Sequence, residues 1–429
     1  MTLYLKNATY IDWRTLAFQS THLAVTPGGD GGIRFLETLP PESDLGADDG
    51  VLDCSRRLVT KAFGCGHHHI YSALARGMPA PPKIPQNFPE ILAYIWWRVD
   101  KALDLEMIEA SALVAALYCV KNGVTFVIDH HASPFAIEGS LRTIAGAFDR
   151  IGVSHLLCYE ISDRDGAAPR EQGLAETETY LQAGNQGHVG LHASFTVGDA
   201  LLKKAVALAQ KYRTGIHVHV AEDQADQDAC LKDHNQRVLE RYRDAGLLDL
   251  KPSILAHCIH LNAAEKELLR RSGVWVVQNV ESNQNNNVGL ANYRVLGEHI
   301  MLGTDGMHSD MLRSAKAAYL AGQAVEGVDM PGIYERFRNV HNYIAANGYS
   351  GDGDNNLVIL DYSSPTEISP NNFLGHFIYG LDACHVDSVI SCGQLVVKNK
   401  TLLTMSEDEI LAFAREMGTK LWRKLKQQN

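Results

Sequence analysis

Two histidines, His67 and His69, are spaced two residues apart and follow a short apolar run that contains Leu58, Val59 and Phe63. In a β-strand, residues two apart point to the same face, so both imidazoles can converge where such a strand ends. Converging imidazoles can hold one divalent ion. The chain has 19 histidines, however, and such a pair can equally serve packing, so the pair alone leaves both interpretations open.

Further polar residues follow later apolar runs, namely His219, Glu222, His257 and Asp305. Glu222 comes three residues after His219, where a carboxylate can move protons between water and substrate without binding the ion itself. Taken singly, Glu222 could be a solvated loop acid, and Asp305 between two glycines could belong to an ordinary turn. Taken together, histidines and carboxylates at the ends of several strands favour a metal site with acid–base chemistry.

The elements that must position these residues alternate regularly from Leu105 onward. Helical stretches such as 105–121 and 200–211 separate apolar runs that we interpret as strands. The runs are 124–128, 154–161, 188–197, 215–222, 253–260, 274–283 and 300–305. With the strand before His67 they make eight strand–helix units, which predicts a (β/α)8 TIM-like barrel with its functional residues at the strand ends.

Both ends of the chain contain short strand-like runs without intervening helices. We therefore predict that residues 1–56 and 355–402 fold together into a small β-sandwich domain, because neither segment can bury a core alone. Residues 57–354 form the metal-dependent barrel in this scheme. Residues 403–429 contain a closing helix that packs on the rest.

Composition narrows the classes of partner. The 429-residue chain has a formal net charge of -11 and no basic run, which argues against nucleic acid or an acidic membrane surface as its partner. The eight cysteines show no paired spacing, and the amino terminus does not have the pattern of a signal peptide. No apolar run approaches the length of a membrane span. We therefore expect a soluble, reduced, cytoplasmic protein.

Seven stretches of the chain resemble the amidohydrolase superfamily, in its cytosine deaminase and chlorohydrolase-like branch, and most closely the SsnA group of aminohydrolases. They are residues 67–77, 96–100, 129–134, 158–160, 217–223, 282–289 and 303–310. The resemblance implies that His67, His69, His219 and Asp305 bind the metal. It also implies that Glu222, His257 and Asp305 are the catalytic residues.

The resemblance favours a single metal ion. Relatives with two ions often carry a bridging lysine at the end of the fourth barrel strand, and the corresponding stretch 190–196 has none. Zinc is the expected ion, and iron would fit the same ligands. Where relatives usually have His-Asn-Pro, this chain has Gln278-Asn279-Val280, so substrate contacts at the seventh strand are expected to differ.

The implied chemistry is hydrolysis. A divalent ion with an open position can lower the pKa of water from about 15.7 toward roughly 7, and the resulting hydroxide would attack an electron-poor sp2 carbon. In this scheme Asp305 would take the water proton and pass it to the leaving group. Glu222 would protonate a nitrogen of the substrate, and His257 would polarise the oxygen under attack.

The leading interpretation is an aminohydrolase that deaminates a purine- or pyrimidine-like heterocycle, with that small molecule and water as its partners and a homo-oligomer, a dimer, as its assembly. One alternative is a ring-opening cyclic amidohydrolase or a chlorohydrolase with the same metal site. Another is a non-catalytic metal-binding barrel, against which Glu222 argues because it is not needed to hold the ion. The candidate substrate contacts are Trp97, His131, Glu160, Arg164 and Asn283.

Overall fold

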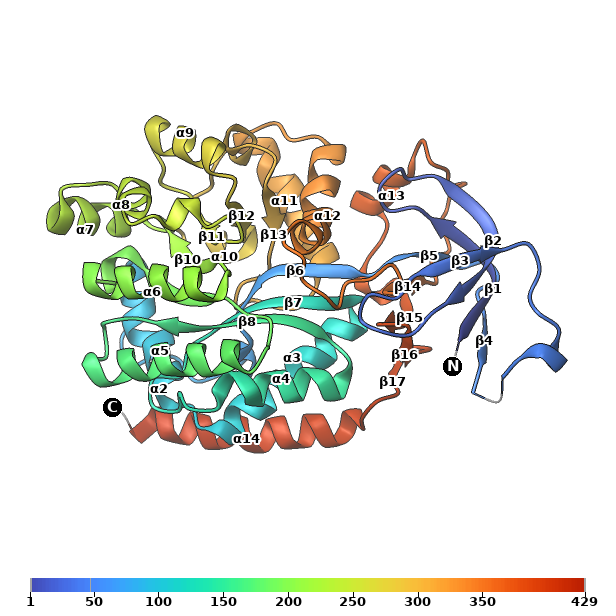
Figure 1. The fold of residues 1–429 in the computed structure, drawn as a ribbon, viewed down its shortest axis with the longest axis horizontal. Helices are drawn as coiled ribbons and strands as arrows, with labels where there is room; N and C mark the ends of the chain where they lie inside the picture. Colours follow the sequence, from blue (N-terminus) through green and yellow to red (C-terminus); the bar gives the residue numbers. More distant parts are fainter. Residues whose placement is uncertain (1, 47, 428–429) are drawn as a thin grey trace.

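Eight parallel strands form the central barrel of the computed structural model, which describes residues 2–46 and 48–427 (Figure 1). In order around the sheet they are β6 (Phe63–His68), β7 (Val124–His131), β8 (Ser154–Ile161), β9 (Val189–Ala193), β10 (Ile216–Val220), β11 (Ile254–His257), β12 (Trp275–Gln278) and β13 (Ile300–Leu302). Each strand pairs in parallel with the next. The barrel predicted from the sequence is therefore confirmed.

The first and last strands meet at a short seam. Between β6 and β13 the structure has an isolated parallel bridge that joins His68 to Asp305. The backbone amides of Thr304 and Asp305 both donate to the carbonyl oxygen of His67, at 3.0 and 3.1 Å. The barrel thus closes at residues that the sequence assigned to the metal site.

Helices connect the strands and cover the outside of the barrel (Figure 1). They are α3 (Leu105–Lys121), α4 (Ser140–Ile151), α5 (Ala167–Gln182), α6 (Asp199–Tyr212), α7 (Gln224–His234), α8 (Val238–Asp244), α9 (Ala263–Ser272), α10 (Val280–Asn285), α11 (Met311–Val325) and α12 (Met330–Ala346). Local sequence sets their ends. The Asp104 carboxylate accepts the amide of Met107 to cap α3, and Asn262 and Glu265 form a reciprocal capping box on α9.

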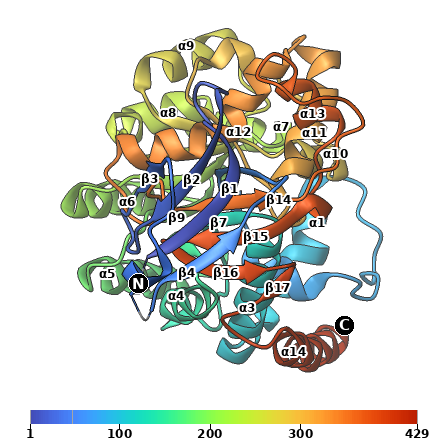
Figure 2. The ribbon, with the colours of Figure 1, turned by 90° about the vertical axis from the view of Figure 1, so that its right-hand side faces the viewer.

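Strands from both chain ends form a second sheet of nine strands (Figure 2). From the amino-terminal part come β1 (Leu3–Ile11), β2 (Phe18–Val25), β3 (Ile33–Leu36), β4 (Gly50–Asp53) and β5 (Leu58–Lys61); from the carboxyl-terminal part come β14 (Leu357–Leu360), β15 (Val386–Ser391), β16 (Gln394–Lys398) and β17 (Thr401–Leu402). β5 lies between β1 and β14 and so joins the two ends. Leu5, Leu23, Val59, Ile359 and Ile390 belong to a separate apolar core of this sheet.

The apolar run before His67 is divided between the two sheets. The sequence placed this run in the first barrel strand, but Leu58–Lys61 pairs with β1 and β14, and the barrel strand begins at Phe63. The change of sheet is held at the backbone, where Nη1 of Arg338 donates to the carbonyls of Lys61 and Ala62 at 3.0 and 3.1 Å. One continuous extended segment therefore connects the two sheets.

The remaining helices lie over the mouth and the edge of the barrel. α1 (Phe88–Ile91), the π-helical turn Leu92–Trp96 and α2 (Trp97–Ala102) follow a proline-rich loop, and α13 (Phe373–Tyr379) follows β14. The closing helix α14 (Glu407–Gln427) packs against α3, and its Trp422 donates from Nε1 to the carbonyl of Leu74. No helix among the described residues is both long and apolar enough to cross a membrane.

Candidate functional site

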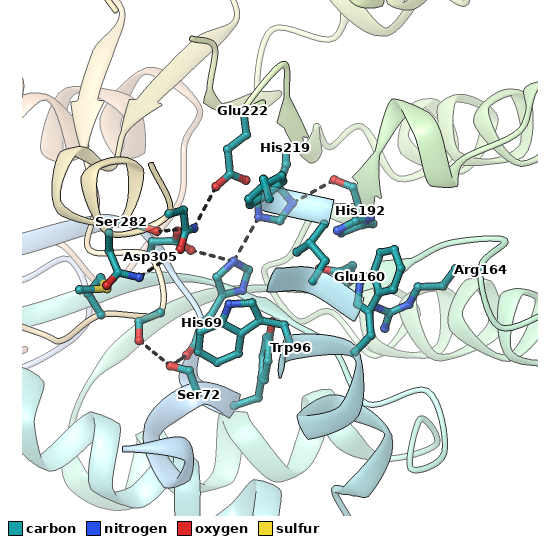
Figure 3. Close-up of a pocket in the computed structure, with 18 residues that line it drawn as sticks. His69, Ser72, Trp96, Glu160, Arg164, His192, His219, Glu222, Ser282 and Asp305 are labelled. Atoms are coloured by element: carbon teal, nitrogen blue, oxygen red, sulfur yellow. Dashed lines mark hydrogen bonds and ion pairs between the residues drawn. The ribbon is translucent and has the colours of Figure 1, made fainter. Parts of the chain in front are cut away.

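Three histidines and one aspartate, His67, His69, His219 and Asp305, bring one side-chain ligand atom each to the carboxyl end of the barrel, all within 4.8 Å of one another. His67 lies in β6 and His219 in β10, while His69 directly follows β6 and Asp305 comes three residues after the end of β13. Oδ1 of Asp305 lies 3.0 Å from Nε2 of His69 and 3.4 Å from Nε2 of His67. Figure 3 shows His69, His219 and Asp305 pointing toward one another.

The hydrogen bonds of two of these rings fix which nitrogen faces the centre. Nδ1 of His69 lies 2.6 Å from the carbonyl oxygen of His130, and Nδ1 of His219 lies 2.9 Å from that of His192. Because a carbonyl can only accept, each ring donates from Nδ1 and as a neutral imidazole leaves Nε2 unprotonated. The two Nε2 atoms nevertheless lie 3.1 Å apart. Two lone pairs at this distance repel, so a proton on one of the rings or a bound cation has to lie between them.

The charges of the group also fit a divalent ion. Burial holds the pKa of His67 and of His219 well below the ordinary value, so both rings are neutral at pH 7. Burial also acts to lower the pKa of His69, but the hydrogen bond and charge of Asp305 outweigh it and raise this pKa to about 9. Without an ion His69 is therefore protonated at neutral pH, and an ion bound at Nε2 would take the place of that proton beside Asp305. Nε2 of His67 is buried without a hydrogen-bond partner among the described residues, as an ion ligand would be.

Next to this group, Glu222 and His257 share an acid–base contact. Nε2 of His257 lies 3.5 Å from Oε2 of Glu222 and 4.0 Å from Oδ2 of Asp305. Burial, with a smaller contribution from Asp305, raises the pKa of Glu222 to about 7 although His257 opposes the shift. A carboxyl group with such a pKa can give and take a proton near neutral pH.

Asn283 of α10 and Asn286, which directly follows this helix, hold the side chains of His257 and Glu222 in place. Oδ1 of Asn283 lies 2.7 Å from Nδ1 of His257, and Nδ2 of Asn286 donates to Oε1 of Glu222 at 3.3 Å. The sequence extended the seventh strand to residue 283, but β12 ends at Gln278 and the chain turns into α10. The helix brings both asparagines to the site.

Three site segments have left-handed backbone at residues other than glycine. The φ angles are 44° at Ala221, 72° at His257 and 52° at Asp305. Such a conformation costs roughly 1–2 kcal/mol for each residue with a side chain, and it persists where surrounding contacts hold it. The amide of Ala221 donates to Oδ2 of Asp226 at 2.9 Å, and the hydroxyl of Tyr293 donates to the carbonyl of His257 at 2.6 Å. These contacts turn the functional side chains toward one another.

A pocket of about 630 Å³, which includes space open to solvent, leads to the metal-binding group. Of the five substrate contacts expected from the sequence, Trp97, Glu160 and Arg164 line it. The lining residues that the sequence did not single out are Tyr71, Ser72, Phe88, Leu92, Trp96, His192, Ser282, Asn285, Asn286, Gly306 and Met307. His192 lies in β9, and the others come from loops and short helices, where neither periodicity nor spacing marks a residue as facing the site.

The other two expected substrate contacts are not among the residues that line the pocket. His131 is buried on the far face of its strand, where Nε2 contacts the hydroxyl of Ser133 at 3.0 Å. Asn283 lies behind His257 and touches the ring nitrogen that faces away from the pocket. In the structure Asn283 therefore contacts and orients His257, instead of lining the pocket as a substrate contact.

Comparison with known proteins identifies the family. The model of the amidohydrolase family matches residues 58–333, well over half of the chain. The chain belongs to the amidohydrolase family. Amidohydrolase relatives include the 5'-deoxyadenosine deaminase of Methanopyrus kandleri, 29% identical with 91% of this chain and 93% of that protein covered. A 5-methylthioadenosine/S-adenosylhomocysteine deaminase of Syntrophomonas wolfei is 27% identical, with 89% of this chain and 90% of that protein covered. The family and its named relatives identify the protein as a hydrolase that acts on carbon–nitrogen bonds.

Solved structures of the amidohydrolase fold are similar over nearly the whole chain. An adenosine deaminase from Xanthomonas campestris with bound zinc superposes with a TM-score of 0.81 at 19% identity, covering 98% of both chains. The atrazine chlorohydrolase of Arthrobacter aurescens, complexed with zinc, superposes with a TM-score of 0.78 at 14% identity, covering 97% of this chain and 100% of that chain. At these identities the likeness shows a shared fold.

Proposed function

We propose that this amidohydrolase removes an amino group from a purine-like nitrogen heterocycle by hydrolysis, with one zinc ion held by His67, His69, His219 and Asp305. The observation that carries the proposal is the environment of Glu222. It is a buried carboxyl group with a pKa raised to about 7, beside the metal-binding group and in the pocket wall. A metal site that served structure alone would have no need of such a proton carrier.

When bound, the ion supplies an activated water and a Lewis acid at the end of the pocket. Asp305, whose Oδ2 faces His257, takes a proton from the attacking water and later passes it to the leaving amine. Glu222 carries the proton that a ring nitrogen receives as the carbon becomes tetrahedral. His257, fixed by Asn283, faces the same space and stabilises charge that develops on the attacking oxygen.

The pocket walls support a flat aromatic substrate. Phe88, Leu92, Trp96 and Trp97 come from the segment that covers the barrel mouth, and His192 faces Trp97 with ring centroids 6.0 Å apart. Aromatic side chains pack well against the faces of a heterocycle. The related deaminases, whose names specify 5'-deoxyadenosine and 5-methylthioadenosine or S-adenosylhomocysteine, support an adenine-type ring.

The test is release of ammonia by zinc-loaded protein from a panel of purines, adenine nucleosides, pyrimidines and cyclic ureides. Ammonia from an adenine-type compound, with the 6-oxo product formed in equal amount, is the expected result. Chloride from a chlorinated triazine, or ring opening of a cyclic ureide without free ammonia, would replace the proposal with one of those hydrolytic reactions. Absence of turnover on the whole panel would count against deamination of these rings.

A further inference from the structure

Three carboxylates line the pocket, and they lie on different sides of His219. Glu222 and Asp305 lie on one side in Figure 3, and Glu160 lies on the other beside His192 and Arg164. Glu160 comes from the end of β8, and one of its oxygens lies within 4.8 Å of a ring nitrogen of His219. It therefore faces the space next to the reaction centre, and the acid–base steps above leave it without a role.

Glu160 has unused capacity to accept hydrogen bonds. Its side chain is only 4% exposed, and its single ion-pair partner among the described residues is His130, with Nδ1 3.4 Å from Oε2. The other ring nitrogen of His130 faces the carbonyls of Leu191 and His217 at 3.1 and 3.2 Å, so its proton is directed away from Glu160. Oε1 accepts no hydrogen bond from the described part of the chain. A buried carboxylate needs several donors, and a ligand in the pocket can supply the rest.

The neighbouring arginine does not make this end of the pocket suited to anions. Arg164 is bound through Nη2 to Asp100 and through Nε to Asp165, at 2.9 Å for the latter. Asp165 also pairs with Lys101 at 2.7 Å. The third nitrogen of the Arg164 side chain, Nη1, is buried without a partner in the described residues and is not exposed to a ligand. Glu160, Asp100 and Asp165 are three acids, and Arg164 and Lys101 are two bases. The formal charge of these five side chains together is therefore negative.

From this arrangement we infer that Glu160 determines specificity by accepting N–H groups from the ring edge of the substrate. The inference rests on the proposed function and deepens it. The substrate is a heterocycle that presents an exocyclic amino group to Glu160, and an oxo or carboxylate group at this edge is rejected. Rejection follows because an acceptor placed there leaves the buried carboxylate without donors and adds repulsion between oxygens.

Two matched pairs of ligands test the inference. 2,6-Diaminopurine and 2-hydroxyadenine share the 6-amino group and carry an amino or an oxo group, respectively, at C2. The pyrimidines 2,4-diaminopyrimidine and cytosine differ at C2 in the same way. Affinity is measured by calorimetry on zinc-loaded Glu222→Gln protein, which separates binding from turnover, and kcat/KM is measured on the wild-type background. The diamino member of at least one pair should be preferred by roughly ten- to hundredfold, the range expected for a hydrogen bond to a charged group.

The decisive variant is Glu160→Gln, made in both backgrounds. Its amide can donate as well as accept, so the preference for the diamino ligand should fall to within about threefold or reverse. Glu160→Asp, which keeps the charge, should retain the preference with weaker binding. The matched control is Glu171→Gln on the exposed face of α5, which should leave the preference unchanged. If Glu160→Gln folds poorly by thermal melting, Glu160→Ala replaces it with the same expectation.

The two proposals fail separately. If no ligand is deaminated but the binding preference depends on Glu160, the specificity assignment stands and the reaction assignment falls. If ammonia is released while wild-type protein treats each pair alike, or Glu160→Gln keeps the wild-type preference, the specificity assignment is overturned.

Discussion

Nδ1 of His67 lies 2.9 Å from Nε2 of His217, a fully buried histidine in the interior of the barrel. His67 can present an unprotonated Nε2 to an ion only when its proton is on Nδ1. His217 provides the acceptor for that proton. It comes from the same strand as His219, two residues earlier, so in the proposed site β10 would supply one metal ligand and orient another.

Replacing this acceptor should weaken metal binding without removing a ligand. His217→Leu is expected to lower zinc affinity about 10–100-fold, the usual effect of losing an outer partner of a ligating histidine. His217→Gln, which can still accept a hydrogen bond, should lose less. Affinity is measured by competition with a chromophoric chelator. The control is His299→Gln, an exposed ring stacked on Trp275, and equal affinity in His217→Leu and wild type would contradict the assigned role.

Metal-replete protein should contain close to one divalent ion per chain. Four ligand atoms converge at one point, and the fourth barrel strand ends without a lysine that could bridge a second ion. Elemental analysis after dialysis against metal-free buffer measures the content. His67→Ala and Asp305→Ala should lose the ion. Two full equivalents in the wild-type protein would overturn the single-ion assignment.

Substitution of Glu222 should separate catalysis from metal binding. Glu222→Gln is expected to keep the ion and the fold, while turnover falls by roughly 10²–10⁴-fold because a general acid–base group is lost. His219→Ala should lose metal and activity together. Metal content and turnover are measured on the same preparations. Loss of zinc from Glu222→Gln would make Glu222 a ligand, and full activity would require another proton carrier.

Acidification should destabilise the metal-free protein through buried neutral histidines. His188 lies just before β9 with Nε2 2.8 Å from the hydroxyl of Tyr343, and burial lowers its pKa to about 3. In the unfolded chain the pKa is about 6.5. The stability from this group is therefore present above pH 6.5 and is lost as pH falls toward the folded value. Between pH 7 and pH 5 the loss is about 2 kcal/mol.

The test compares chemical unfolding of wild type and His188→Gln at pH 7 and pH 5 with a chelator present throughout. The glutamine cannot titrate, so the free energy of unfolding should fall by about 2 kcal/mol less in the variant over this interval. An equal fall in both proteins would mean that other groups dominate the acid response.

Truncation should show that the two chain ends fold as one unit. β14 pairs with β5 on one edge and with β15 on the other, and its Ile359 shares a core with Val59. A chain that ends at residue 355 leaves β5 as an open edge and exposes this core, so it should be insoluble. Soluble fraction and zinc content are compared with those of the full chain. A soluble, zinc-loaded truncation would show that the ends are independent.

The sequence predicted the barrel well where periodicity and end signals agree. Helix 105–121 and strand 154–161 have the bounds expected from the sequence, the helix because Asp104 caps its start and Asn122-Gly123 ends it. The seventh strand was extended too far because Val280 continues the apolar run. Asn279 has a backbone conformation that starts α10, and no apolar pattern reveals this turn.

The pocket was harder to predict because strand alternation does not say which face points inward. His130 and His131 are adjacent, and the sequence chose His131 as a substrate contact. It is His130 that lies beside His67 and His219, with ring centroids 5.9 and 4.6 Å away. Residues such as Trp96 and Asn286 reach the site through loops and short helices, and their contacts depend on tertiary packing.

The seam between β6 and β13 would give a bound ion a structural role as well as a chemical one. Asp305 and His69 are joined across it by one carboxylate–imidazole contact, and they are 236 positions apart in the chain. An ion bound to both would hold the first and last strands of the barrel together, where otherwise only a few backbone hydrogen bonds join them. Metal removal would then free the first and last strands to separate before the rest of the barrel, and two sheet edges would become open to other chains. The same atoms that activate water would in this way protect the protein from aggregation.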